Sequence, residues 1–161
     1  MTREEAIEKL HGLIKDVKIA MLTTLDGGVM RARPMATQQA KFDGTLWFMT
    51  SSRTHKVDEV RADNRVNVSY SDPSHNTYVS VSGRADVVTD RAKIEELWNP
   101  IYKAWFPDGL DDPTICLLKV HVDQAEYWDS SSSTLVQVVG FVKALATGKP
   151  ADGGDHEQLN L

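Results

Sequence analysis

The chain has 161 residues, of which 41% are hydrophobic and 25% charged, and its formal net charge is -5 at pH 7. This length and composition favour one soluble domain with a single core. Proteins that bind nucleic acid normally carry a basic stripe, which this acidic chain lacks. No run approaches the roughly 20 apolar residues that a membrane span needs, and the N-terminus has no apolar signal-peptide core. We therefore expect a cytoplasmic protein with no nucleic-acid or membrane partner.

The N-terminal quarter predicts a helix followed by strands. Thr2, Glu4 and Glu5 are typical of a helix start, and apolar residues then recur at helical spacing. Residues 17–25 are β-prone, and the Asp26-Gly27-Gly28 turn leads into a second strand over residues 29–37. A third strand is expected over residues 45–50, so that the three form an antiparallel meander.

The second of these strands carries two arginines on one face. Because side chains alternate along a strand, Arg31 and Arg33 lie on the same side as Val29 and Met35. Two neighbouring guanidiniums require an anion between them. The alternative interpretation is that both are simply solvated, as charged side chains on a strand usually are.

A polar run follows the third strand. It comprises Thr50, Ser51, Ser52, Arg53, Thr54, His55 and Lys56. Residues 54–63 are predicted to be helical, which places the run at a helix N-terminus, where free N–H groups and the helix dipole favour an anion. The run therefore predicts a phosphate-binding site; the alternative is an ordinary helix cap.

Three more strands are expected over residues 65–71, 78–88 and 114–128, with a bulge or bend at Gly83. Six antiparallel strands fit a small barrel better than a layered α/β sheet, and no Gly-rich nucleotide-binding motif follows any strand. Cys116, the single cysteine, lies in an apolar run and predicts a buried, inert thiol. No Cys/His spacing predicts a metal site.

The remaining segments predict helices and a tail. Asp90 is expected to cap a helix over residues 91–97, after which Tyr102, Trp105 and Phe106 either pack in a core or wall a cleft for a planar ring. A helix over residues 134–146 is apolar on an unusually wide arc, which predicts contact with a second subunit. Residues 1–146 are expected to form one domain and residues 147–161 a flexible tail.

Four segments spread over most of residues 5–145 are similar, in order and spacing, to a known family. They are Arg33-Pro34-Met35, Trp47 to Thr50 with Ser51 and Lys56, Val81 to Ala85, and Glu126 to Asp129. The chain resembles the flavin-binding split barrels related to pyridoxamine 5′-phosphate oxidase, and within them the general stress protein 26 group. The resemblance implies a mainly β, six-stranded antiparallel split barrel of Greek-key type with flanking α-helices.

The same resemblance implies a bound FMN, with FAD or another flavin as alternatives. Its phosphate carries about −1.5 to −2 charges at pH 7, which two or three cations would balance. The family pattern assigns the phosphate to Arg33, Ser51 and Lys56, and the isoalloxazine ring to the backbones of Pro34, Met35, Met49 and Thr50. The strand and helix arguments add Arg31, Thr54 and His55.

Members of this family usually pair, which implies a homodimer with the flavin at the subunit interface. Trp128 of the partner subunit would then contact the ring or the ribityl chain; alternatively, Trp128 only ends a strand in the core.

The chain also departs from the namesake oxidase. No lysine follows Arg33 within seven residues, and Asp129 to Thr134 stands where the oxidase has an Arg/His pair. Oxidation of pyridoxamine phosphate is therefore not expected. We expect an FMN-dependent oxidoreductase acting on a small molecule, or a stress-related flavin-binding or sensing protein without turnover. A haem or deazaflavin ligand is a third hypothesis. No catalytic residue is assigned, because flavin chemistry requires mainly orientation and tuning from the protein.

Overall fold

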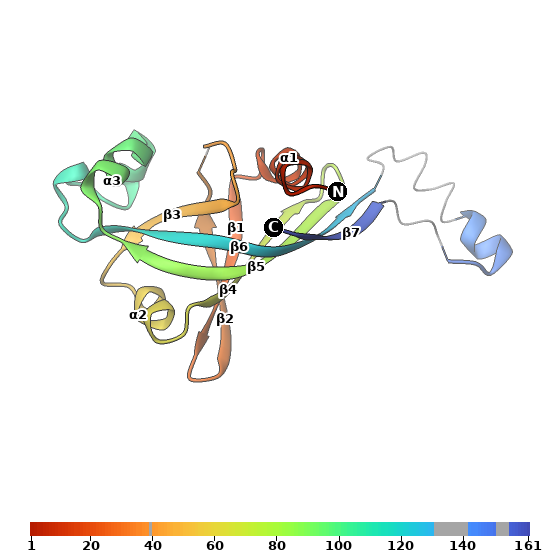
Figure 1. Cartoon of the computed structure of the whole chain (residues 1–161), viewed down its shortest axis with the longest axis horizontal. Helices are drawn as coiled ribbons and strands as arrows, with labels where there is room; N and C mark the ends of the chain where they lie inside the picture. Colours follow the sequence, from red (N-terminus) through yellow and green to blue (C-terminus); the bar gives the residue numbers. More distant parts are fainter. Residues whose placement is uncertain (39, 131–141, 151–154) are drawn as a thin grey trace.

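The computed structural model describes residues 1–38, 40–130, 142–150 and 155–161. Six strands form a single antiparallel sheet that curls into a half-barrel, as predicted, in the order β2-β1-β4-β5-β6-β3 (Figure 1). Helices lie around this sheet, and residues 142–147 are also helical. The elements are α1 (Arg3–Ile14), β1 (Ile19–Asp26), β2 (Val29–Ala36), β3 (Thr45–Ser51), α2 (His55–Ala62), β4 (Arg65–Asp72), β5 (Thr77–Val88), α3 (Arg91–Leu97), the 3-10 helices η1 (Pro100–Ala104) and η2 (Gly109–Asp111), and β6 (Ile115–Asp129).

Local sequence signals determine the first elements. The Thr2 hydroxyl accepts a hydrogen bond from the Glu5 amide, and the Glu5 carboxylate accepts one from the Thr2 amide, which makes a capping box at the start of α1. Between β1 and β2, Gly27 and Gly28 have φ angles of 56° and 85°. Two consecutive positive φ angles define the tight turn that suits a twisted hairpin.

The expected three-strand meander is wrong at its third strand. β1 and β2 do form a hairpin, but β3 pairs with β6, with Thr45 opposite His121 and Ser51 opposite Ile115. β4 pairs with the other edge of β1, and β2 lies at one end of the strand order. Neighbouring segments of the chain often pair, yet a long-range partner that buries a better face can replace them.

The bend expected at Gly83 is confirmed. The register between β5 and β6 shifts at Ser82 and Gly83, where the two backbones come close together. A Cβ atom on Gly83 would lie 2.0 Å from the carbonyl oxygen of His121. Only glycine permits this approach, which helps the sheet to curl.

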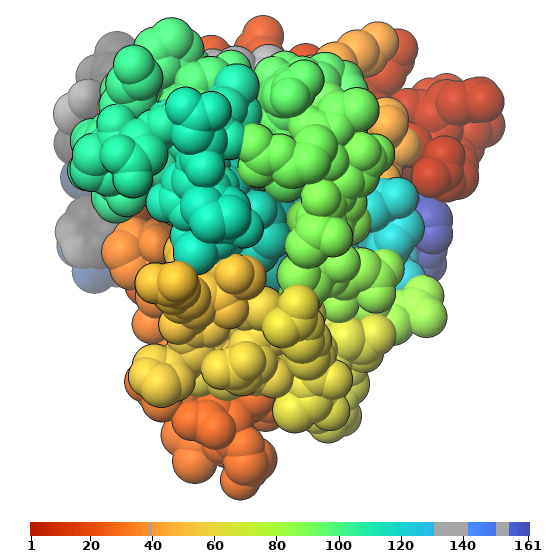
Figure 2. Space-filling view, turned by 90° about the vertical axis from the view of Figure 1, so that its left-hand side faces the viewer, coloured from red at the N-terminus to blue at the C-terminus, as the bar shows by residue number. Residues whose placement is uncertain are grey.

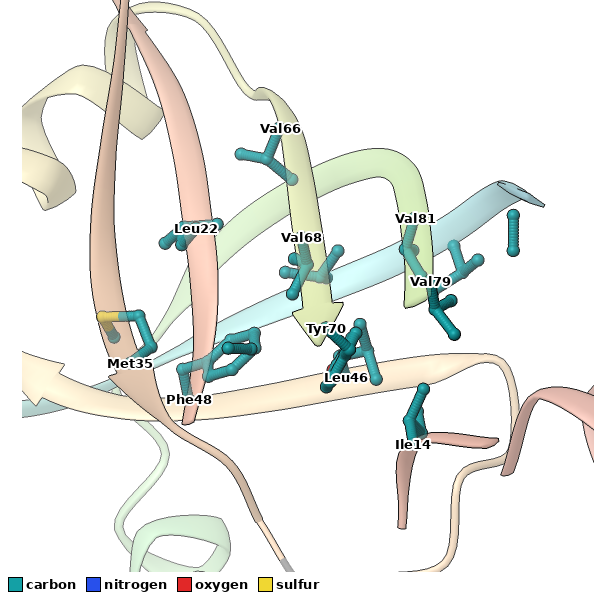
Figure 3. Packing of buried hydrophobic residues seen from close by; sticks show 14 of the residues in the cluster. Ile14, Leu22, Met35, Leu46, Phe48, Val66, Val68, Tyr70, Val79 and Val81 are labelled. Carbon is teal, nitrogen blue, oxygen red and sulfur yellow. The ribbon is translucent and has the colours of Figure 1, made fainter. Parts of the chain in front are cut away.

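The main core fills the inside of the half-barrel. Figure 3 shows side chains from β1, β2, β3, β4 and β5 pointing toward one another, among them Leu22, Phe48 and Val68, all at most 1% exposed. A second cluster packs α3 and η1 against the other face of β6. It consists of Ile94, Leu97, Tyr102, Phe106, Ile115 and Leu117. β6 is thus buried on both faces where it begins, and Cys116 is buried there as predicted.

The expectation of a flexible tail over residues 147–161 is wrong for its last part. Residues 155–160 form a further strand, β7 (Asp155–Asn160), which pairs antiparallel with Gln124–Asp129 of β6. Leu159 is 3% exposed and belongs to the main core. Most of the helix predicted over residues 134–146 lies outside the described residues. Within the described ranges, no helix is long and apolar enough to cross a membrane.

Candidate functional site

A pocket of about 440 Å³ opens where β2 and β3 end beside the start of α2. This volume falls within the usual range for small-molecule sites, about 300–1,000 Å³. Seven of the residues predicted from the sequence lie together in its wall. They are Pro34, Met35, Met49, Thr50, Ser51, Thr54 and Lys56.

Among the described residues, Lys56 is the one lysine or arginine in the wall of this pocket. Its ammonium group donates a hydrogen bond to the Thr50 hydroxyl at 3.0 Å. Burial lowers the pKa of Lys56 below its ordinary value, and the nearby charge of Arg33 lowers it further. No carboxylate of the described residues forms an ion pair with Lys56. A half-buried cation without an ion-pair partner favours the binding of an anion.

The start of α2 lies in the same wall. Thr54 is the N-cap residue, but its hydroxyl makes no capping bond and donates instead to the Ser51 carbonyl at 2.8 Å. The first N–H groups of a helix lack partners within the helix, so α2 begins without the side-chain cap that would satisfy one of them. Ser51 is held in turn by a hydrogen bond from its hydroxyl to that of Thr114 at 3.1 Å. Hydroxyls, a cation and a helix N-terminus therefore converge at one end of the pocket.

The two arginines of β2 find their anion within the protein. Arg33 donates to a carboxylate oxygen of Glu59 at 2.7 Å, and Arg31 lies 3.7 Å from the other oxygen of the same carboxylate. The Thr24 hydroxyl donates to Glu59 at 2.5 Å and accepts from Arg33 at 2.6 Å. Glu59, on α2, is almost completely buried. Arg31 also pairs with Asp26 at 3.0 Å, so neither guanidinium lacks an anion.

Figure 2 shows how these elements meet at the surface: α2 lies between the β1–β2 hairpin and the segment that runs from α3 to η2. The Glu59 cluster connects α2 to the hairpin, whereas Lys56 and Thr54 line the pocket. Arg31 and Arg33 do not line it. Arg33 is nevertheless near enough to lower the pKa of Lys56 by its charge.

Two other predicted residues also lie outside the pocket. His55 is the first residue of α2 but its side chain is exposed and not in the pocket wall. Trp128 is near one end of β6, whereas Ile115 at the opposite end pairs with Ser51. Its ring stacks on His156 of β7, with centroids 5.0 Å apart. Within one chain, Trp128 therefore does not reach the pocket.

The aromatic cluster predicted from the sequence packs in a core and also lines the pocket; the binding of a planar ring there stays a prediction. Tyr102 and Phe106 are buried in the second core cluster and also line the pocket. Trp105 lines the pocket too but is 63% exposed. The Tyr102 hydroxyl accepts a hydrogen bond from the side-chain amide of Gln38 at 2.8 Å, which fixes one wall.

Two residues that the structure brings to this region could not be predicted from local sequence patterns. Ile19 lines the pocket from β1, at a position indistinguishable from other apolar strand positions. Glu59 follows Asp58 in a helix, and nothing local separates the buried carboxylate from the exposed one. Glu59 differs from Asp58 because the arginines of β2 lie beside it in the folded chain.

A six-stranded antiparallel half-barrel with a pocket at the ends of β2 and β3 is the architecture of a split barrel. In agreement, the sequence profile of the pyridoxamine 5′-phosphate oxidase-like family matches residues 5–152. The chain belongs to this family.

Individual relatives agree with this placement. Protein bli-3 of Neurospora crassa is 31% identical over 159 residues, which cover 92% of this chain and 76% of the relative. A general stress FMN/FAD binding protein from Xanthomonas citri is 33% identical, with a TM-score of 0.70, over 81% of this chain and 92% of that one. A protein from Jannaschia sp. CCS1 assigned to general stress protein 26 is 26% identical, with a TM-score of 0.78, over 98% and 99% of the two chains.

Proposed function

We propose that this protein binds FMN in the pocket between β2, β3 and α2 and acts as an FMN-dependent oxidoreductase on a small molecule. The observation that carries the proposal is Lys56, a half-buried cation that, among the described residues, bonds to a hydroxyl and to no carboxylate, and that lies beside a helix start without a side-chain cap. A phosphate would supply the missing negative charge. The Xanthomonas citri relative, described as FMN/FAD binding, makes a flavin the natural source of that phosphate.

The residues around the pocket fit the two ends of such a ligand. The phosphate end would be held by Lys56 and by the hydroxyls of Thr50, Ser51 and Thr54, which stand together in the wall. Arg31 and Arg33 belong to the same proposal as the positive surroundings of the phosphate, and His55, the first residue of α2, as a further polar neighbour. Arg33 would act across the short distance over which it already influences Lys56.

The apolar side of the pocket suits a planar ring. Pro34 and Met35 come from β2 and Met49 from β3, and the exposed Trp105 stands in the same wall. Aromatic and apolar side chains bind flat rings well because they bury a large area. The flavin, when bound, would supply the hydride chemistry; these side chains would orient the ring and exclude water from one of its faces.

We further propose a homodimer in which Trp128 of the partner subunit completes the site. Trp128 is 40% exposed and lies away from the pocket of its own chain, so only a second chain could bring this side chain to the flavin. The apolar arc predicted over residues 134–146 includes two described residues, Val142 and Leu145, which are 57% and 71% exposed. Apolar side chains exposed to this degree are suited to a subunit interface. A cytoplasmic location is part of the same proposal.

The alternative function is flavin binding without turnover, and one observation supports it. In the described pocket wall, Lys56 and Tyr102 are the only titratable side chains, and burial raises the pKa of Tyr102. Because Lys56 would be engaged by the phosphate, a proton for the substrate would have to come from solvent. Oxidation of pyridoxamine phosphate stays outside the proposal, because the pocket has no second phosphate-binding group among these residues.

Two measurements on the purified protein test the proposal. The absorption spectrum and a titration with FMN should show reversible binding, and denaturation should release intact FMN. Oxidation of a reduced nicotinamide in the presence of quinone or nitro acceptors would then distinguish the oxidoreductase from the binding protein. A protein that takes up no flavin would refute the proposal. Flavin binding without nicotinamide oxidation would favour the alternative.

A further inference from the structure

The buried carboxylate of Glu59 pairs with the arginines of β2 and is near enough to Lys56 to act on it by its charge. Arg33 and Thr24 both donate to one of its oxygens, at 2.7 and 2.5 Å. Glu59 lies one helical turn after Lys56, so both side chains project from the same side of α2. Glu59 is thus a buried negative charge on the helix that would receive the phosphate.

The charges around the site show what this carboxylate does. Arg31 is neutralised by Asp26 and Arg33 by Glu59, which leaves Lys56 as a surplus of one positive charge. A phosphate ester at pH 7 carries about −1.5 to −2 charges, more than Lys56 alone balances. The guanidinium of Arg33 would complete the balance, but its hydrogen bonds go to Glu59, Thr24 and the Leu22 carbonyl. Glu59 and a bound phosphate would therefore compete for the charge of Arg33.

We infer that Glu59 weakens the binding of a phosphate dianion in this pocket by neutralising Arg33, and so sets how strongly FMN is preferred over an uncharged flavin. The inference rests on the proposed FMN site. Glu59 acts through Arg33 and is a specificity-determining residue rather than a ligand. Its carboxylate also satisfies the buried guanidinium when no phosphate is present, which explains why a negative charge is tolerated there.

Glu59→Gln separates the charge of this side chain from its shape. The amide oxygen can occupy the position of the carboxylate oxygen that accepts from both Arg33 and Thr24, so these two bonds are kept. The amide nitrogen then faces Arg31, which retains Asp26 as its partner. The variant should bind FMN on the order of tenfold more tightly, because one nearby negative charge is lost. Riboflavin, which has no phosphate, should bind as it does to the wild type.

Fluorescence titrations of the full chain with FMN and with riboflavin provide the test. Asp123→Asn is the matched control: it removes one carboxylate and changes the net charge equally, but Asp123 is exposed on β6 and pairs with Arg84, outside the proposed site. Its FMN affinity should stay near that of the wild type. The inference is overturned if Glu59→Gln binds FMN no more tightly than the wild type, or if Asp123→Asn gains as much. A wild type that binds no FMN would overturn the proposed function as well.

The wild-type complex gives a second measurement that does not depend on the stability of the variant. In a crystal structure with FMN, the Arg33 guanidinium should contact a phosphate oxygen and still lie beside Glu59. The inference is wrong if the Glu59 carboxylate lies farther from the phosphate than about 8 Å, the screening length at physiological salt. It is also wrong if Arg33 makes no contact with the phosphate.

Discussion

The ammonium group of Lys56 and the hydroxyl of Thr50 form a hydrogen bond of 3.0 Å that joins the first turn of α2 to the end of β3. If this group binds the phosphate of FMN, Lys56→Ala should weaken FMN by about 1.5–3 kcal/mol, or roughly ten- to a hundredfold. Riboflavin should be little affected, and added salt should weaken FMN more than riboflavin. Lys119→Ala is a suitable control, because Lys119 lies over the Trp47 ring outside the pocket. Equal losses for both ligands would contradict a phosphate role.

The same lysine predicts a pH dependence. Burial and the charge of Arg33 lower the pKa of Lys56 from 10.5, so the ammonium loses its proton at a lower pH than a free lysine. The preference for FMN over riboflavin should therefore rise while the phosphate loses its second proton, around pH 6, stay level above that, and fall as the pH rises through the lowered pKa of Lys56. Taking the ratio of the two affinities removes effects common to both flavins. In Lys56→Ala this alkaline fall should be absent; its persistence would assign the titration to another group.

Arg33→Ala should reduce stability as well as FMN binding. The substitution leaves the carboxylate of Glu59 buried without its closest cation, and breaking a buried pair in this way costs about 3–5 kcal/mol. Arg65→Ala is the control, since Arg65 pairs with Asp63 on the surface, where such a pair contributes little to stability. Urea unfolding of both variants measures the difference. Equal stabilities would show that Arg33 and Glu59 do not stabilise the contact between α2 and β2.

A pair of glycine substitutions tests the bend in β5. Gly83→Ala would place a Cβ atom 2.0 Å from the His121 carbonyl, so the two backbones must separate, at a cost of at least about 1–3 kcal/mol. Gly12→Ala, within α1, meets nothing within 4 Å and should stabilise the protein by about 0.5–1 kcal/mol. Thermal unfolding should therefore shift in opposite directions for the two variants. A neutral Gly83→Ala would show that the sheet can adjust at this point.

Replacement of Leu159 tests whether β7 belongs to the folded domain. Leu159 is packed in the main core, and Leu159→Ala should cost about 2–4 kcal/mol of unfolding free energy. Asn160→Ala, at the next and exposed position, should stay within about 0.5 kcal/mol of the wild type. Chemical denaturation measures both. If the two variants are equally stable, residues 155–160 contribute no core contact in solution.

Local patterns in the sequence were sufficient for most elements of the fold. The capping residues of α1, the two glycines of the β1–β2 turn and the bulge at Gly83 each have a nearby physical cause, and the structure confirms them. The partner of β3 depends instead on which distant strand presents a matching edge. The sequence of β7 has no alternation of apolar and polar residues that would predict a strand, because Leu159 is its one buried residue. Strand pairing of this kind is a property of the whole chain.

The residues of the site also divide into those that local sequence predicts and those that only the folded chain brings together. The polar run before α2 was sufficient to place Thr50, Ser51, Thr54 and Lys56 together, because a strand end and a helix start are adjacent in the chain. The pair of arginines on β2 correctly indicated an anion, but the structure supplies Glu59 from α2. A buried glutamate is recognisable only when its cations are known, and these come from a different part of the sequence.

The edge of β6 that faces away from β5 is shared by two strands. β3 pairs with Ile115 to His121, and β7 pairs with Gln124 to Asp129. An uncovered edge offers a row of free N–H and C=O groups to which a strand from another molecule can add. If β7 separates from the sheet, that row becomes available, and a β7 from a second molecule matches it equally well. While it stays paired, β7 therefore protects the domain against aggregation, and it is also the strand that two molecules could exchange.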